Sequence, residues 1–406
     1  MAPKKSAHAA PLEIRTATPS SVRAVNRSIM LELVRRHQPI SRADLARLTG
    51  VFRSSVSEII DELLAESLLV EERDTSERSR GRVPMSLRLN ETSHHVLGLN
   101  IRPSYSQLAY AGLSGRIQNS LIFETPTSPK KLVRAVQKAV LELREGREGE
   151  NNGSFQRIGI AIPGHVNALT GQILWIPTHT ELTGFPIAQE VQQQTGVDTV
   201  ADNDCNVGAL SELWLSTERK KDRSTDFIFL NVSDFGTGAG TVINGEAYLG
   251  HDAHFAAEVG HMVVEPSGPP CSCGRRGCWE LYVSNNATWG RVHPRSPFTE
   301  KGFEELLAAA RKGDEASLKS VRETARYLSL GLSNIGFAFN PAEVVIAGRI
   351  TAAWDLIRDD LTKRYGSSHL QYAVRPARLS ADDSLLHGAV CLALRETFAG
   401  PKFGQN

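Results

Sequence analysis

Four residues near position 270 are of the types that bind a transition metal. Cys271, Cys273 and Cys278 fall within eight residues, and His261 lies ten residues before the first of them. Zinc binds thiolate sulfur and imidazole nitrogen, and a closed structural site takes four such ligands. This set leaves no position for a reacting water, so the pattern predicts a structural zinc site. Because Cys-x-Cys is tighter than the common Cys-x-x-Cys, chance placement or a redox pair is the alternative interpretation.

Two carboxylates flank this predicted metal site. Glu258 lies three residues before His261, and Glu280 lies two residues after Cys278. A metal that fixes the loop also fixes the direction of both side chains. Two rigidly held carboxylates can accept hydrogen bonds from adjacent hydroxyls, which suits a sugar. The alternative is a pair of solvated surface acids.

The same stretch resembles a known family. Glu-Val-Gly-His at 258–261, followed by Cys-x-Cys-Gly-x-x-Gly-Cys-x-Glu at 271–280, is similar to the motif of the ROK family of repressors and sugar kinases. The resemblance implies an α/β fold with a two-lobed body, actin-like or ribonuclease H-like, and a sugar site in the cleft. In the kinases of this family an Asn-Asp pair binds the sugar, and its aspartate is the general base. Carried over residue by residue, the resemblance assigns the sugar contacts to Gly164, Asn203, Asp204, Glu258, His261 and Glu280.

The phosphate-binding side departs from the kinase pattern. ROK kinases carry Asp-x-Gly-Gly-Thr after the first strand, and the corresponding stretch here is Asn100-Ile101-Arg102-Pro103-Ser104. Proline has no N–H to offer a phosphate, and Asn100 lacks the charge that helps to hold magnesium. A second glycine-rich loop remains at 236–240, but Arg349 follows Gly348 where the kinases have Gly-Gly. We therefore expect a degenerate kinase without catalytic residues.

Two similar sets of elements must position these residues. Strands are predicted at 96–101, 107–113, 117–123 and 158–162 around a helix at 129–144, and again at 227–232, 240–244 and 343–347 with one long helix at 302–339. The repetition predicts a two-lobed body over residues 91–406. Its first lobe covers about 91–200 plus the C-terminal helix 384–398, and its second lobe about 201–383.

The N-terminal segment is typical of a DNA-binding domain. Apolar residues at helical spacing predict a helix from residue 21 to Pro39, a short helix at 42–48 and, after a Thr-Gly turn, a third at 52–66. Two strands with a charged tip follow, so residues 20–90 are expected to form a winged helix-turn-helix. A small helical domain that binds protein is the alternative. The predicted DNA contacts are the basic and small polar residues Arg42, Arg53, Ser54, Ser55, Ser57, Arg80, Gly81 and Arg82.

Composition limits the compartment and the partners. The chain of 406 residues is 41% hydrophobic and 22% charged, as soluble globular proteins are. It has no run of eighteen apolar residues, and residues 1–19 lack the apolar core of a signal peptide, so a disordered leader and a cytoplasmic protein are expected. Residues 1–56 contain ten Lys and Arg against three Asp and Glu, although the whole chain carries a net charge of +1. This asymmetry favours a polyanion partner for the first segment alone.

Together these features predict a transcriptional regulator, most simply a repressor. A homodimer or dimer of dimers would bind double-stranded operator DNA, and a sugar or sugar phosphate in the zinc-organised cleft would control that binding. No membrane partner is expected. The alternatives are an ATP-dependent sugar kinase that also binds DNA, and a zinc-stabilised scaffold whose body binds another protein.

Overall fold

The computed structural model describes residues 18–73, 85–146, 155–217, 225–251, 257–363 and 372–398. The chain divides into two compact units: Met1–Asn90 with Arg395–Asn406, and Glu91–Leu394. Of the helices in the described ranges, none is both long and apolar enough to cross a membrane. The predicted leader, 1–19, falls almost entirely outside the described ranges, and the first helix begins at Pro19 with Thr18 as its N-cap.

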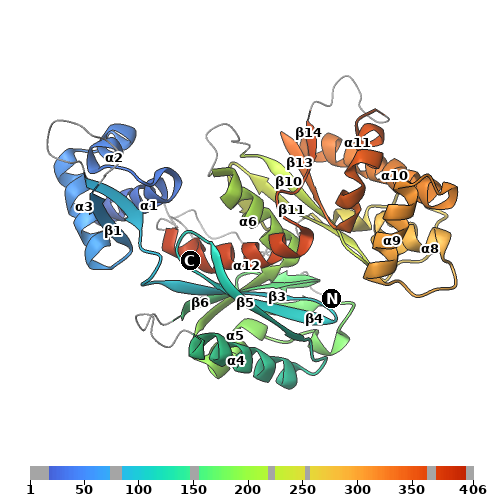
Figure 1. Cartoon of the computed structure of the whole chain (residues 1–406), viewed down its shortest axis with the longest axis horizontal. Coiled ribbons are helices and arrows are strands. Elements are labelled where there is room, and N and C mark those ends of the chain that lie inside the picture. Colours follow the sequence, from blue (N-terminus) through green and yellow to red (C-terminus); the bar gives the residue numbers. More distant parts are fainter. Residues whose placement is uncertain are drawn as a thin grey trace, which may run out of the picture. The chain divides into compact units, whose positions relative to one another are not determined.

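The N-terminal unit is a helix-turn-helix followed by two antiparallel strands (Figure 1). Ser41 accepts a hydrogen bond from the N–H of Asp44 and so caps the second helix, which ends at Gly50 with a φ of 70°. The third helix buries Val56, Ile59, Ile60 and Leu63, the spacing of one helical face. The elements are α1 (Pro19–His37), α2 (Arg42–Thr49), α3 (Arg53–Ala65), β1 (Leu69–Arg73) and β2 (Met85–Leu89).

The body consists of two lobes, each built on a five-stranded sheet. The first lobe contains β3 (His95–Ile101), β4 (Tyr105–Ala111), β5 (Ile117–Glu124), α4 (Pro129–Glu145), β6 (Phe155–Ile162), β7 (His165–Asn167), β8 (Gln172–Trp175), η1 (Thr180–Leu182), α5 (Ile187–Thr195) and β9 (Asp198–Asn203). Next come α6 (Asp204–Thr217), β10 (Phe227–Val232), β11 (Thr237–Ile243), β12 (Glu246–Tyr248), η3 (Val259–His261), α7 (Glu280–Val283) and α8 (Asn285–Val292). The chain continues with α9 (Glu300–Arg311), α10 (Glu315–Phe339), β13 (Glu343–Ala347), η4 (Arg349–Ala353), α11 (Trp354–Lys363), β14 (Ala373–Pro376) and α12 (Ala381–Phe398).

The two sheets have the same topology. Their strand orders are β5-β4-β3-β6-β9 and β12-β11-β10-β13-β14. In each sheet a central strand, β3 or β10, pairs antiparallel on one side and parallel on the other. This repeat confirms the predicted α/β fold, in which a winged helix-turn-helix precedes a two-lobed body of the actin-like type.

Helices cover both faces of each sheet (Figure 1). Helices α4 and α5 pack on one face of the first sheet, while α6 and α12 pack on the other. In the second sheet, α9, α10 and α11 pack on one face and α6 on the opposite face. Helix α6 therefore lies between the two sheets, and its first residue, Asp204, reaches the space between the lobes.

One predicted element is wrong: the single helix at 302–339 is two helices, α9 and α10. Gly313 between them has a φ of 90°, a left-handed conformation that ends a helix. Asp314 then caps α10, because its carboxylate accepts a hydrogen bond from the N–H of Ser317 at 2.9 Å. Apolar residues continue at helical spacing on both sides of Gly313, so their pattern does not show that one helix ends and another begins there.

Candidate functional site

The four predicted metal ligands lie together in the second lobe. The ligand atoms of His261, Cys271, Cys273 and Cys278 are all within 4.8 Å of one another. Sγ of Cys271 is 3.5 Å from Nδ1 of His261, and Sγ of Cys273 is 3.5 Å from Sγ of Cys278. Zn–S bonds of about 2.3 Å in a tetrahedron separate the ligand atoms by about 3.8 Å, so these residues fit a closed zinc site. The three cysteines have free thiols, so their sulfur atoms are available as metal ligands.

The metal loop is anchored through Trp279, the residue after Cys278. Trp279 is completely buried, and its indole Nε1 donates a hydrogen bond to the carbonyl of Tyr327 in α10 at 2.7 Å. Gly331 makes room for the ring, because a Cβ at that position would lie 2.0 Å from the indole. The core of the second lobe therefore fixes the backbone next to Glu280, the residue that follows.

The two flanking carboxylates have different neighbours. Oε1 of Glu280 accepts a hydrogen bond from the Cys271 thiol at 3.0 Å and lies 3.4 Å from Nδ1 of His261. Oε1 of Glu258 lies 3.3 Å from Nε2 of His165, a first-lobe residue on β7. Burial, followed by the hydrogen bond to Glu280, raises the pKa of the Cys271 thiol to about 12. Metal binding must therefore displace this proton.

The predicted Asn203-Asp204 pair forms the junction between β9 and α6. Nδ2 of Asn203 donates a hydrogen bond to the carbonyl of Gly164 at 2.7 Å, and its Oδ1 accepts one from the N–H of Cys205 at 2.8 Å. Burial raises the pKa of Asp204 to about 6, although hydrogen bonds from Cys205 oppose the shift. A carboxyl that titrates near neutral pH is typical of a functional site.

All six predicted sugar contacts line one cavity of about 1030 Å³ between the lobes. Ligand pockets of drug-sized molecules have volumes of about 300–1,000 Å³, so a sugar fits easily. Gly164, Asn203 and Asp204 come from the first lobe and its junction with α6, whereas Glu258, His261 and Glu280 come from the second. A ligand that contacts both groups would touch both lobes.

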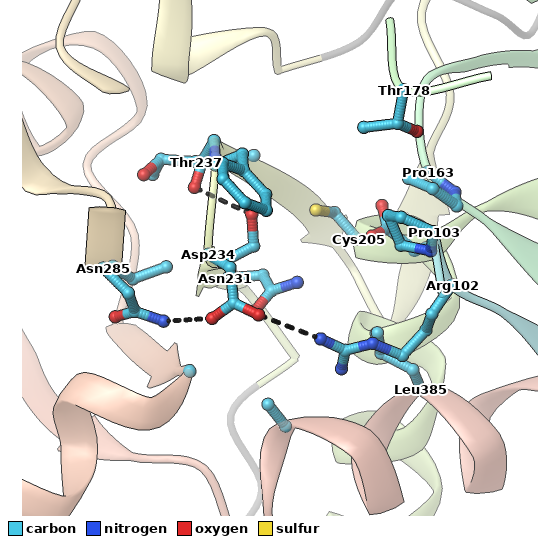
Figure 2. A pocket seen from close by; sticks show the side chains of 18 of the residues that line it. Arg102, Pro103, Pro163, Thr178, Cys205, Asn231, Asp234, Thr237, Asn285 and Leu385 are labelled. Atoms are coloured by element: carbon cyan, nitrogen blue, oxygen red, sulfur yellow. Dashed lines mark hydrogen bonds and ion pairs between the residues drawn. The ribbon is translucent and has the colours of Figure 1, made fainter. Parts of the chain in front are cut away.

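Arginine–carboxylate pairs that the sequence analysis did not predict lie at another part of this cavity (Figure 2). Nη2 of Arg102 is 3.5 Å from Oδ2 of Asp234, and Arg102 also pairs with Asp382 at the start of α12. Asp234 accepts a hydrogen bond from Nδ2 of Asn285 at 2.8 Å and lies 3.5 Å from Nε of Arg349. The two arginines that stand at kinase glycine positions are thus engaged with carboxylates. Those two replacements were the sequence signal that could have pointed to the pairs.

The predicted DNA contacts in α3 differ in exposure. Arg53 and Ser54 in its first turn are exposed, and Ser55 and Ser57 are partly exposed. Phe52, which the sequence analysis did not single out, precedes the helix and is 84% exposed. An apolar side chain at this place can contact a thymine methyl group.

The remaining predicted DNA contacts are Arg42 in α2 and three residues of the wing tip. Arg42 forms ion pairs with Asp61 at 2.7 Å and with Glu71 at 3.1 Å, so a DNA contact by this side chain would have to replace them. The wing-tip residues Arg80, Gly81 and Arg82 lie outside the described residues.

Comparison with known proteins agrees with this architecture. The ROK family model matches residues 97–396. A xylose repressor of Bacillus subtilis (strain 168) is 27% identical over 351 residues, which cover 85% of this chain and 88% of that protein. A glucokinase of Streptomyces coelicolor is 30% identical over 286 residues, covering 66% of this chain and 86% of the enzyme. The crystal structure of a ROK family transcriptional regulator, a homolog of the E. coli MLC protein, has a TM-score of 0.78 at 22% identity and covers 93% of this chain and 97% of that chain.

These matches extend the resemblance from a motif to most of the chain. The family match spans both sheets of the body, and the regulator structure covers so much of the chain that it must include part of the N-terminal unit. The glucokinase match covers a smaller share of the chain. The chain belongs to the ROK family.

Proposed function

We propose that this protein is a transcriptional repressor whose affinity for operator DNA changes when a sugar or sugar phosphate binds in the cavity. The observation that carries the proposal is the combination, in one chain, of a helix-turn-helix unit with a cavity lined by all six predicted sugar contacts. The similarity to a xylose repressor along most of the chain supports it.

The DNA-binding part of the proposal rests on α3. Its first turn presents the exposed Arg53 and Ser54 together with Ser55, and Ser57 follows at the start of the next turn. The N-terminal end of a recognition helix enters the major groove, where such side chains contact bases and phosphates. We assign Arg80, Gly81 and Arg82 to phosphate and minor-groove contacts of the wing. Palindromic operators require an even number of copies, so we propose a homodimer or a dimer of dimers acting on DNA in the cytoplasm.

Zinc has a structural role in this proposal. His261, Cys271, Cys273 and Cys278 would hold it, and four protein ligands leave no position for a substrate water. The bound metal would supply rigidity to the loop that carries Glu280. The residues of the chain itself, including Glu258 and Asn203, would then accept and donate the hydrogen bonds to the sugar hydroxyls.

Control of DNA binding requires that the sugar prefer one arrangement of the protein. The cavity is lined by both lobes, so a ligand that contacts both of them favours one distance between them. Asp382, which lines the cavity, lies in the first turn of α12, and the residues of this helix from Arg395 on belong to the N-terminal unit. Coupling free energies of about 1–3 kcal/mol change an affinity by about 5–150-fold.

The same proposal makes the body a degenerate kinase. Pro103 has no N–H for a phosphate, and Arg102 is held by Asp234 and Asp382 where a kinase loop has glycine. A second candidate is an ATP-dependent sugar kinase, which the raised pKa of Asp204 favours, since a general base works best near the ambient pH. The kinase would release ADP only when sugar is present, and Asp204→Asn would abolish that release.

A gel-shift experiment tests the proposal. The full-length protein is mixed with duplex DNA from upstream of its own gene and titrated with xylose, glucose, N-acetylglucosamine and their phosphates. We expect a retarded band that one of these sugars abolishes. Retention of the band with all of them, together with no heat of sugar binding in calorimetry, would instead support the zinc-stabilised scaffold. Sugar-dependent ADP formation would support the kinase.

A further inference from the structure

Four buried polar side chains of residues that line the cavity lack complete hydrogen bonding. They are Asn100 (1% exposed), Asn231 (4%), Thr237 (8%) and Asn285 (1%), from β3, β10, β11 and α8. Among the described residues no partner exists for either polar atom of the Asn100 side chain, for Oδ1 of Asn231 and Asn285, or for Oγ1 of Thr237. Figure 2 shows Asn285 beside Asp234, with Asn231 and Thr237 in the same pocket.

Unpaired polar atoms in a buried place cost free energy unless a ligand or ordered water satisfies them. Four such side chains from four elements, all belonging to residues that line one cavity, therefore indicate a ligand-binding surface. Each carries an amide or a hydroxyl, which is uncharged, and the set both donates and accepts hydrogen bonds. Sugar hydroxyls have the same two capacities.

The charges around these side chains disfavour an anion. Two arginines and seven carboxylates line the cavity. Arg102 already pairs with Asp234 and Asp382. Arg349 pairs with Glu300 at 2.5 Å and with Glu304 at 3.3 Å. Guanidinium groups are common phosphate ligands in proteins, and here both of them are already paired with carboxylates.

We propose that these four side chains bind uncharged hydroxyl groups of the effector, and that the protein therefore responds to a neutral saccharide and rejects sugar phosphates and nucleotides. The proposal rests on the function proposed above and names the chemical class of its ligand. Asn100, Asn231, Thr237 and Asn285 are the recognising residues.

Isothermal titration calorimetry with the full-length protein tests this assignment. The probes are glucose, N-acetylglucosamine, xylose and cellobiose, the 6-phosphates of the first two sugars, and the ATP analogue AMPPNP. We expect one of the uncharged sugars to bind, and any phosphate to bind at least about tenfold more weakly, a difference of 1.4 kcal/mol. Tighter binding of a sugar phosphate or of AMPPNP overturns the proposal.

Variants test the contribution of these side chains separately from that of the charge. Asn100→Ala and Thr237→Val should each raise the Kd of the uncharged sugar about 5- to 30-fold, whereas Asn119→Ala on the exposed surface of β5 should leave it unchanged. Asn231→Ala is the substitute if one of the first two does not fold. Unchanged Kd values in these variants overturn the assignment of the residues.

The outcomes separate this inference from the proposed function. If a sugar phosphate binds and releases operator DNA, the repressor proposal stands and the inference fails. If no sugar of either class binds, the sugar-controlled function itself fails.

Discussion

Nη2 of Arg102, just after β3, lies 3.5 Å from Oδ2 of Asp234, just after β10. These strands belong to different sheets, so the ion pair joins the two lobes across the cavity. The side chains are only 16% and 12% exposed, and water therefore screens the pair less than a surface pair. Through this pair, the loops that follow β3 and β10 contact each other.

Removing Arg102 should destabilise the body. In Arg102→Ala, Asp234 and Asp382 lose a cation in a largely buried place, and we expect the free energy of unfolding to fall by about 1–3 kcal/mol. Urea unfolding of the full-length protein measures the change. The control is Arg358→Ala, which removes an arginine that is 64% exposed and should change the stability by less than about 0.5 kcal/mol. Equal effects of the two substitutions would show that the interlobe pair contributes nothing.

Loss of one cysteine should release the metal. Cys278→Ser removes a completely buried sulfur from the four-residue cluster, and we expect zinc affinity to fall at least about 100-fold and the melting temperature to drop. Metal content by mass spectrometry and melting with and without a chelator give the readouts. Cys391→Ser is the matched control, because this cysteine is buried on α12, away from the cluster. One equivalent of zinc in both variants would contradict the four-ligand assignment.

The stability should depend on pH through Asp204. Its pKa of about 6 in the folded protein exceeds the ordinary value of 3.8, so between these values the folded state holds a proton that the unfolded state lacks. This stabilisation is complete below about pH 4 and is lost as the pH rises through 6. Asp204→Asn keeps a neutral group at all pH values, and it should therefore stabilise the protein above pH 6 by about 1–3 kcal/mol, with little effect near pH 4.

Urea unfolding from pH 4 to pH 8 checks this dependence on Asp204. Glu305→Gln serves as the control, since its carboxylate on α9 is 69% exposed and its loss should change the stability little at any pH. A stability difference for Asp204→Asn that does not grow with pH would show that this carboxyl is not destabilised by burial.

Arg53 should contribute to DNA affinity. Its exposed guanidinium lies in the first turn of α3. We expect Arg53→Ala to weaken operator binding about 5- to 20-fold. If Arg53 contacts a phosphate, the slope of the logarithm of the affinity against the logarithm of the salt concentration should also become shallower by about one unit. Fluorescence anisotropy with an operator duplex, measured at salt concentrations from about 50 to about 200 mM, gives both the affinity and its salt dependence. Arg36→Ala is the control, because Glu32 already matches that charge in α1 at 2.5 Å. If the control lost as much affinity as Arg53→Ala, α3 would have no special role in DNA binding.

The sequence by itself determined the features that depend on near neighbours in the chain. His261 and the three cysteines lie within one loop, where spacing alone limits the possible geometry, and the structure brings their ligand atoms together. Caps and apolar spacing likewise predicted the helix-turn-helix, because a helix satisfies its own backbone and shows its buried face every three or four residues. Gly313 is the exception, since apolar spacing continued across it.

Only the tertiary structure decided which distant groups meet. Arg102 and Asp234 are 132 positions apart, and the unpaired amide oxygens of Asn100 and Asn285 come from different lobes. Such groups become neighbours because two sheets and the helix between them pack into one body, and no local pattern encodes that packing. The charge balance of the cavity, and with it the preference for an uncharged ligand, therefore emerges only when the lobes come together.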